Sequence, residues 1–132
     1  MAESYAGGLE GQVAAVTGAS SGLGQATALA VAQAGADVAL LARSAEDLEH
    51  TAAIVRSVGR QALVLPIDLA REDEILSAVD SVVRQWRRVD ILVNAAATDV
   101  PARVVDLSTE AWDQVLAVNL RAPFLLARAV LP

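Results

Sequence analysis

A glycine-rich segment near the N-terminus has the residue types and the spacing of a phosphate-binding loop. Residues 17–24 are Thr-Gly-Ala-Ser-Ser-Gly-Leu-Gly, and they end the apolar run 12–17. Glycines allow a sharp turn from a strand into a helix, and they let a phosphate approach the backbone without meeting a Cβ. The free N–H groups at the start of the next helix attract negative charge. We therefore predict a nucleotide-phosphate site that includes Gly18, Ser20, Ser21, Gly22, Leu23 and Gly24.

The same segment matches one other catalytic motif. Residues 18–22 have the pattern Gly-x-Ser-x-Gly, in which a serine at a strand-to-helix turn acts as a nucleophile. A hydrolase of this kind needs an acid and then a histidine after the serine. The only histidine, His50, falls in the middle of a predicted helix, where we expect it to be exposed to solvent. No Gly-Lys-Ser/Thr follows the glycines, which excludes a P-loop.

Composition excludes several further classes of site. The 132 residues have a formal net charge of −6, which argues against binding to nucleic acid or to an anionic membrane. With no cysteine and one histidine, neither a disulfide framework nor an ordinary zinc site is expected. All 10 basic residues are arginine, so no lysine base is available within the chain. Tyr5 is the only tyrosine, and it precedes the first predicted strand.

Apolar runs alternate with helical patterns along the whole chain. We expect strands at about 12–17, 38–42, 62–67 and 89–94, and helices at about 22–34, between Ser44 and Gly59, at about 72–86, and after Ser108. Apolar strands that alternate with helices indicate a parallel sheet covered on both faces. Right-handed crossovers make this a doubly wound α/β sheet of the Rossmann type, with four strands in place of about six.

Apolar spacing within the helices predicts which faces are buried. The first helix carries an apolar stripe of Leu23, Ala26, Ala30 and Ala34. Trp86 and Trp112 complete apolar stripes on two later helices, so both are expected in the core. Ser44 is expected to cap the second helix, with Asp47 three residues further on.

Four motifs in chain order resemble the short-chain dehydrogenase/reductase family. They are Thr-Gly-x-x-x-Gly-x-Gly at 17–24, Asp68 after the third strand, Asn94-Ala95-Ala96-Ala97 after the fourth, and Asn119 between Val118 and Leu120. The resemblance covers residues 9–132 as one NAD(P)-binding domain, after a flexible tail of residues 1–8. It implies that Asp68, with Leu69 beside it, binds the adenine, and that Asn94, Ala95 and Ala96 line the cofactor. Ala95 and Ala97 depart from the family's Asn and Gly.

The residues after the second strand bear on the choice of cofactor. An acidic residue at this strand end binds the ribose 2′-hydroxyl of NAD, whereas a nearby arginine accommodates the 2′-phosphate of NADP. Here the position is Ala42, followed by Arg43 and Ser44. Arg43 can clamp a phosphate and Ser44 can add a hydroxyl, so NADP(H) is favoured over NAD(H). The alternative is an exposed arginine in a turn.

Asn119 is the one candidate catalytic residue, and Pro123 lies four residues after it. Proline has no N–H to bond the carbonyl of Asn119, so we expect a freed carbonyl and an irregular helix. The family resemblance implies that this carbonyl holds a water linked to a catalytic lysine. The alternative is a helix irregularity around a buried asparagine.

The resemblance implies an oxidoreductase that moves hydride between a nicotinamide and a small alcohol or carbonyl compound. The family's Tyr-x-x-x-Lys is missing, and the sequence ends at Leu131-Pro132 inside an apolar helical pattern. We therefore expect an N-terminal fragment, truncated at its C-terminus, that associates but is inactive alone. The alternative is a cofactor-binding or interaction module without catalysis. A cytoplasmic location is expected, because no signal peptide or membrane span is evident. The resemblance implies a dimer or tetramer for the longer protein.

Overall fold

The computed structural model describes residues 7–132, so most of the predicted tail of residues 1–8, including Tyr5, lies outside the described residues. The strands are β1 (Val13–Thr17), β2 (Asp37–Ala42), β3 (Ala62–Pro66) and β4 (Ile91–Asn94). The helices are α1 (Gly22–Gln33), α2 (Ala45–Ser57), α3 (Glu72–Trp86), α4 (Thr109–Leu116) and α5 (Ala122–Val130). A 3-10 turn (Val104–Asp106) precedes α4, and a π-helical turn (Ala117–Arg121) joins α4 to α5.

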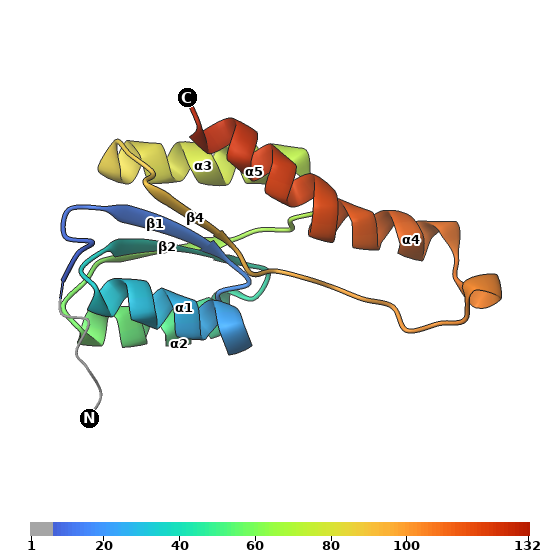
Figure 1. The fold of residues 1–132 in the computed structure, drawn as a ribbon, viewed down its shortest axis with the longest axis horizontal. Coiled ribbons are helices and arrows are strands. Elements are labelled where there is room, and N and C mark those ends of the chain that lie inside the picture. Colours follow the sequence, from blue (N-terminus) through green and yellow to red (C-terminus); the bar gives the residue numbers. More distant parts are fainter. Residues whose placement is uncertain (1–6) are drawn as a thin grey trace.

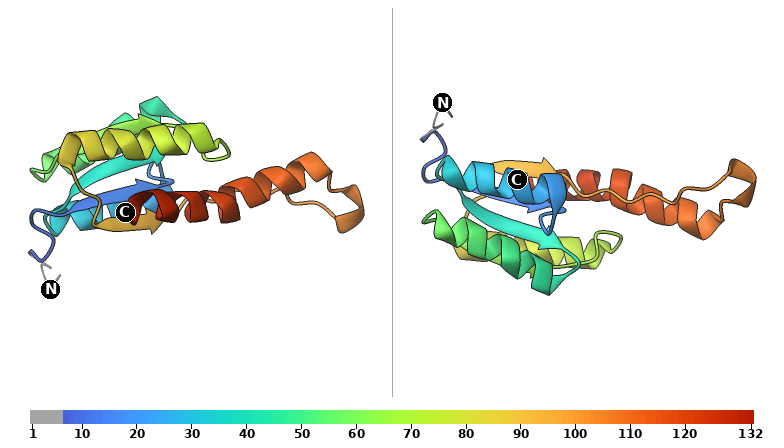
Figure 2. Two further views of the ribbon diagram at one scale, coloured as in Figure 1. Left: turned by 90° about the horizontal axis from the view of Figure 1, so that it is seen from above. Right: turned by 90° about the horizontal axis from the view of Figure 1, so that it is seen from below.

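The four strands form one parallel sheet in the order β3-β2-β1-β4. Helices α1 and α2 cover one face of the sheet, and α3 and α5 cover the other (Figures 1 and 2). Strands β1 and β2 lie at the centre and are almost wholly buried, as their unbroken apolar sequences predict. The predicted doubly wound α/β sheet is therefore confirmed.

Each face of the sheet has its own hydrophobic core. Side chains of β1 and β2 that point to one face pack with α1 and α2, as Val38 packs with Leu48 and Val55. Those that point to the other face pack with α3 and α5, as Leu41 packs with Ile75 and Leu125. Alternate residues of each central strand thus pack into different cores. Packing on both faces holds the strands in place at the edge where the loops emerge.

The buried face of α1 differs from the prediction. Gly24, Ala28 and Ala32 are buried, whereas Leu23 is 76% exposed and Ala26 and Ala30 lie on the exposed side. Alanines occur all round this helix, so spacing alone did not distinguish its faces. Close packing of Gly24 against the glycine loop, described below, sets the face that meets the sheet.

Only one of the two tryptophans joins a core. Trp86 is half-buried against the α3 side of the sheet, and its Nε1 donates a hydrogen bond to Oε1 of Gln61 at 3.0 Å. Trp112 is 55% exposed, so its predicted place in the core is wrong. The reason is the position of α4, which extends beyond the sheet with the chain that precedes it (Figure 1).

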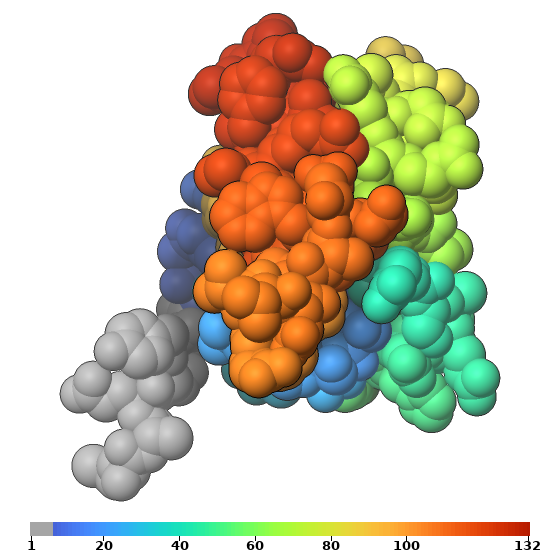
Figure 3. Space-filling model, turned by 90° about the vertical axis from the view of Figure 1, so that its right-hand side faces the viewer, coloured from blue at the N-terminus to red at the C-terminus, as the bar shows by residue number. Residues whose placement is uncertain are grey.

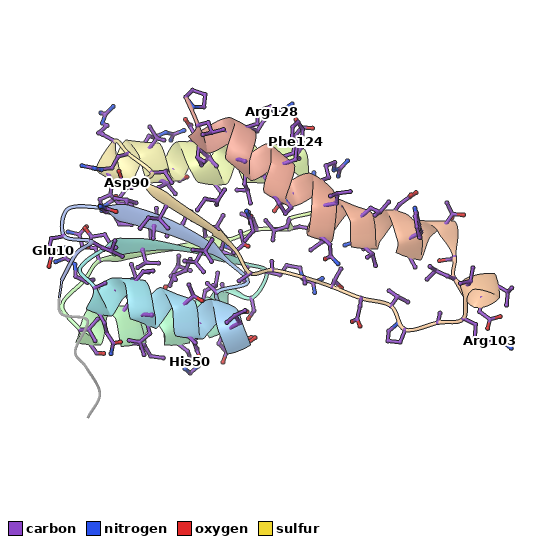
Figure 4. The ribbon with its side chains drawn as sticks, viewed as in Figure 1. Glu10, His50, Asp90, Arg103, Phe124 and Arg128 are labelled. Atoms are coloured by element: carbon purple, nitrogen blue, oxygen red, sulfur yellow. The ribbon has the colours of Figure 1, made fainter. Side chains whose placement is uncertain are left out.

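The amino ends of the strands, away from the glycine loop, are held by a charged cluster. Asp90 accepts hydrogen bonds from the Arg88 guanidinium, at 2.7 and 2.8 Å, and from the Val13 N–H at 2.8 Å. The Arg88 hydrogen bond in particular holds the pKa of Asp90 below its ordinary value. In Figure 4 Asp90 lies at the turn that leads into β4.

Within residues 7–132, no helix is both long enough and apolar enough to cross a membrane.

Candidate nucleotide-binding site

The topology brings four loops to one edge of the sheet. Because all strands are parallel, their carboxyl ends lie together: Thr17 pairs with Leu41 and with Asn94, and Ala42 pairs with Pro66. The chain leaves β1 toward β2 and later returns to its other side as β4, so the strand order reverses at β1. Ligands of open α/β sheets bind in the crevice at such a reversal. Here the edge holds a cleft of about 550 Å³.

The cleft gathers the residues predicted for the cofactor, with one exception. Every predicted cofactor-binding residue except Asn94 lines it, and Ala42, Asp47, Ala97, Thr98, Gln114 and Val118 complete the lining. Asn94 is the last residue of β4 and is exposed off the cleft. The sequence around Thr98, Gln114 and Val118 did not predict them as part of the site. They line the cleft because they lie on the long segment that follows β4.

We call this segment, residues 95–121, the arm. It leaves the sheet after β4, turns at the 3-10 helix and returns through α4 and the π-helical turn (Figure 1). Viewed end-on in Figure 3, the arm (orange) projects in front of the sheet edge, with α5 (red) above it and the starts of α1 (blue) and α2 (teal) below. The arm thus forms one side of the cleft and the glycine loop forms the other.

Two glycines of the loop are required by close packing. A Cβ at Gly24 would overlap the carbonyl oxygen of Gly18 and lie 3.0 Å from the main-chain nitrogen of Ala19. A Cβ at Gly18 would lie 2.9 Å from the main chain of Ala96, in the loop after β4. The missing side chain at Gly24 lets α1 pack closely against the glycine loop. The missing side chain at Gly18 lets the glycine loop pack against the loop after β4.

Gly22 has a different role from these two. It has φ +54°, and a Cβ at this position would meet no atom within 4 Å, so the space beside it is open. Gly22 begins α1 and lines the cleft, so the open space lies at a helix N-terminus, where unbonded N–H groups attract anions. The side chain of Ser21, at the N-cap, makes no capping hydrogen bond. This arrangement fits a phosphate group.

Thr17 joins the glycine loop to the loop after β4. The residue is 2% exposed, and its hydroxyl accepts hydrogen bonds from the N–H groups of Ala95 and Ala96, both at 3.1 Å. It also donates to the Val93 carbonyl oxygen at 3.4 Å. These bonds involve only the backbone of the Asn-Ala-Ala-Ala motif, so alanine at 95 does not disturb them. The motif in the sequence includes Thr17 but does not predict this role for it.

Asp68 is held by the backbone at the β3 side of the cleft. Its Oδ1 accepts a hydrogen bond from the Ala70 N–H at 2.9 Å, and its own N–H donates to Oε1 of Glu74 at 3.3 Å. Among residues 7–132 the second carboxylate oxygen accepts no hydrogen bond, so Asp68, which lines the cleft beside Leu69, keeps a free acceptor. An exocyclic amino group of a base is a suitable donor for it.

Arg43 and Ser44 lie together at the β2 end of the cleft. The Ser44 hydroxyl accepts a hydrogen bond from the Asp47 N–H at 3.2 Å, so the predicted helix cap is confirmed. Arg43 is exposed and forms no ion pair with any carboxylate of the described chain. Asp47, in the first turn of α2, also lines the cleft.

The π-helical turn holds two of the cleft loops. The Asn119 amide accepts from the Thr98 N–H and donates to the Thr98 carbonyl oxygen, both at 2.8 Å. Arg121 donates to the carbonyl oxygen of Ala70 at 2.6 Å. The predicted irregularity before Pro123 is confirmed, because the Ala122 N–H bonds the carbonyl of Ala117, five residues back. Asn119 is exposed, so the alternative of a buried asparagine is wrong.

His50 lies far from a catalytic position. It is exposed on α2 and points away from the sheet (Figure 4). A nucleophile at Ser20 would therefore have no histidine beside it. In the part of the chain that the structure describes, no group of three or more histidine and acidic side chains could hold a metal ion.

Comparisons with known proteins agree on one family. The profile described as short chain dehydrogenase matches residues 12–132. A short chain dehydrogenase of Pseudocercospora fijiensis is 40% identical over 98% of this chain and 43% of its own length. The crystal structure of a metagenomic short-chain oxidoreductase in complex with NADP superposes with a TM-score of 0.89 at 38% identity, over 92% of this chain and 56% of that one.

A second solved structure carries the other nicotinamide cofactor. Carveol dehydrogenase from Mycobacterium avium, in complex with NAD, superposes with a TM-score of 0.89 at 29% identity, over 96% of this chain and 50% of that one. The chain thus spans about half the length of the relatives it matches.

Proposed function

Because this chain belongs to the short-chain dehydrogenase family, we propose that it is the NAD(P)-binding half of an oxidoreductase. The reaction is hydride transfer between the nicotinamide and a small alcohol or carbonyl substrate. The observation that carries this proposal is the open space at Gly22, where a helix N-terminus lines a cleft at the strand-order reversal. A pyrophosphate is the anion that such a site accepts in α/β sheets.

Each part of the dinucleotide has a matching group in the cleft. The N-terminus of α1, with Ser20 and Ser21, binds the pyrophosphate, and Asp68 accepts a hydrogen bond from the adenine amino group. Leu69 and the backbone of residues 95–96 line the rest of the cofactor. When bound, the dinucleotide supplies the hydride chemistry. This chain binds and orients it.

We assign the preference for NADP(H) to Arg43. Relatives bind either cofactor, as the NADP and NAD complexes illustrate, so the choice depends on local residues. Ala42 leaves no carboxylate at the end of β2 to receive a ribose hydroxyl. Arg43 follows it and forms no ion pair with another of residues 7–132. A guanidinium is well suited to a phosphate because it offers parallel N–H donors.

The test is the affinity of residues 1–132 for NADPH and for NADH, measured by titration calorimetry. Arg43→Ala should weaken NADPH by about 1.5–3 kcal/mol, one charge-assisted contact, and leave NADH nearly unchanged. Arg103→Ala is the matched control, because it removes the same charge at the tip of the arm (Figure 4). Equal weakening of both cofactors by Arg43→Ala, or tighter binding of NADH by the wild type, contradicts the assignment.

We further propose that residues 1–132 alone do not turn over a substrate. Reduction of a carbonyl needs a proton donor positioned at the developing alkoxide, which raises the rate by roughly 10²–10⁴. The chain has no lysine, and its only tyrosine is Tyr5. Asn119 contributes its main-chain carbonyl to an ordered water, but that carbonyl cannot supply a proton. The alternative function, a module that binds the cofactor without catalysis, gives the same result for this chain.

An NADPH oxidation assay with a panel of ketones and aldehydes checks this inactivity. Turnover by the 132-residue chain that disappears in Gly22→Val would contradict it. The predicted homo-oligomer and cytoplasmic location of the longer protein stay predictions.

A further inference from the structure

Thr51 makes an unusual pair of hydrogen bonds from the middle of α2. It is fully buried, and it does not line the cleft. Its hydroxyl donates to the carbonyl oxygen of Ala19, in the glycine loop, at 2.7 Å. The same hydroxyl accepts a hydrogen bond from Nε2 of Gln25, on α1, at 3.0 Å. One side chain therefore joins the loop and both helices on this face of the sheet.

The direction of these bonds follows from the groups involved. A carbonyl oxygen only accepts, so the Thr51 proton is committed to Ala19. The hydroxyl oxygen is then left as an acceptor, and the amide of Gln25 supplies the donor. The N–H of Ala19 is also held, because it donates to the Leu41 carbonyl oxygen at 3.4 Å. Both main-chain groups of Ala19 thus point into the protein.

The Ala19 carbonyl determines where the next N–H points. No peptide bond of the described chain is cis, and in a trans peptide the C=O and the following N–H point in opposite directions. The Ala19 carbonyl points toward Thr51, so the Ser20 N–H points away from it. Ser20 lines the cleft and Thr51 does not.

We infer that Thr51 is a positioning residue, which fixes the Ala19–Ser20 peptide so that the Ser20 N–H faces the pyrophosphate. This inference rests on the proposed dinucleotide site. Gln25 supports the same arrangement by holding the Thr51 hydroxyl in place. Helix α2, which carries Thr51, also begins beside Arg43 and Ser44. Thr51 therefore lies on the element that connects the two parts of the cleft to which we assign phosphates, the glycine loop and the turn at Arg43 and Ser44.

Loss of the hydroxyl has two structural outcomes. The Ala19 carbonyl either stays buried without a donor, which destabilises the fold, or the peptide rotates and turns the carbonyl toward the cleft. Rotation removes the Ser20 N–H from the phosphate and directs an oxygen at it instead. A carbonyl oxygen repels an anion, so affinity for the dinucleotide falls beyond any change in stability.

Three variants of residues 1–132 separate positioning from simple stabilisation. Thr51→Val keeps the size and removes the hydroxyl, and we expect NADPH and NADH to bind roughly tenfold more weakly or worse. Thr51→Ser keeps the hydroxyl and should bind within about twofold of the wild type. Val55→Ala destabilises the same buried face of α2 without a bond to the loop, and its folded form should bind like the wild type.

Hydrogen exchange of the Ala19 amide, which donates to the Leu41 carbonyl oxygen, tests the loop directly in the ligand-free chain. Exchange should be faster in Thr51→Val than in Val55→Ala when both are compared at equal stability. Wild-type affinity in Thr51→Val, or equal loss in Val55→Ala and Thr51→Val, overturns the positioning role. If the wild type binds neither cofactor, the proposed function fails, and unchanged Ala19 exchange in Thr51→Val then also rejects the role of Thr51 in the loop.

Discussion

Key side chains on the glycine-loop side of the cleft are buried and hydrogen-bonded, whereas large side chains along the arm are exposed. Around the loop, the two fully buried polar residues of the described chain, Thr17 and Thr51, each bond more than one partner. Along the arm and into α5, Trp112, Leu120 and Phe124 are more than half exposed. The loop is thus fixed by contacts within this chain, whereas residues 7–132 leave the apolar surface of the arm exposed to solvent.

The difference extends to the polar bonds of the arm. Asn119 and Arg121 bond the backbone of two cleft loops, but both residues are exposed. Exposed hydrogen bonds stabilise less than buried ones because water competes for both partners. We therefore expect the loop side to be the rigid part of the cleft and the arm side to be the adaptable part.

Substitution of Gly24 should have the largest effect on stability. A Cβ at this position overlaps the Gly18 carbonyl, so Gly24→Ala should lower the free energy of unfolding by about 3 kcal/mol or more. Urea denaturation measures the change. Gly59→Ala is the control, because Gly59 has φ +84° but open space around it, and its strain costs only about 1–2 kcal/mol. A smaller loss at Gly24 than at Gly59 would show that the loop side is not tightly packed.

The exposed surface of the arm should drive association. Leu116, Leu120 and Phe124 line a groove of about 800 Å³, together with Ala70, Ala117 and the polar residues Glu110, Asp113, Gln114 and Arg121. Arg128 lies over the Phe124 ring at 5.2 Å (Figure 4). We expect the chain to self-associate, and Leu120→Asp should weaken the association by roughly tenfold or more.

Sedimentation over a range of concentrations measures this association. Leu76→Asp is the matched control, because Leu76 is 45% exposed on α3, outside the groove. A wild-type chain that stays monomeric at every concentration contradicts the prediction, as does an equal effect of the two substitutions.

Asp68→Ala should have the smallest effect. The loss of one hydrogen bond to the adenine weakens the binding of NADPH and NADH equally, by about 1 kcal/mol. Because the adenine is common to both cofactors, this result differs in kind from the selective loss expected for Arg43→Ala. Titration of the variant with each cofactor provides the check. Discrimination between NADPH and NADH by Asp68→Ala would place its carboxylate elsewhere in the cleft.

The features that the sequence predicts correctly are those that local chemistry determines. Parallel strands end at one edge of the sheet, so motifs after Thr17, Ala42 and Pro66 had to meet there. Pro123 cannot donate a hydrogen bond, so an irregular turn before it was also predictable.

The rest depended on contacts between distant segments. The buried face of α1 is set by Gly24 against Gly18, which apolar spacing does not register. Thr51 acts across 32 residues on Ala19, and Asn119 across 21 residues on Thr98. Trp112 fits an apolar stripe, but that stripe faces outward in this chain. Such long-range pairings need the three-dimensional arrangement.

The open space at Gly22 is, in our proposal, where the phosphates of a nicotinamide dinucleotide bind. The most direct measurement is titration of residues 1–132 and of Gly22→Val with NADPH, with circular dichroism to verify the fold. A Cβ at Gly22 meets no protein atom, so the fold should survive a backbone strain of about 1–2 kcal/mol, while the branched side chain occupies the phosphate position. We predict binding by the wild type and none by Gly22→Val. Undiminished binding by a folded Gly22→Val would contradict the account.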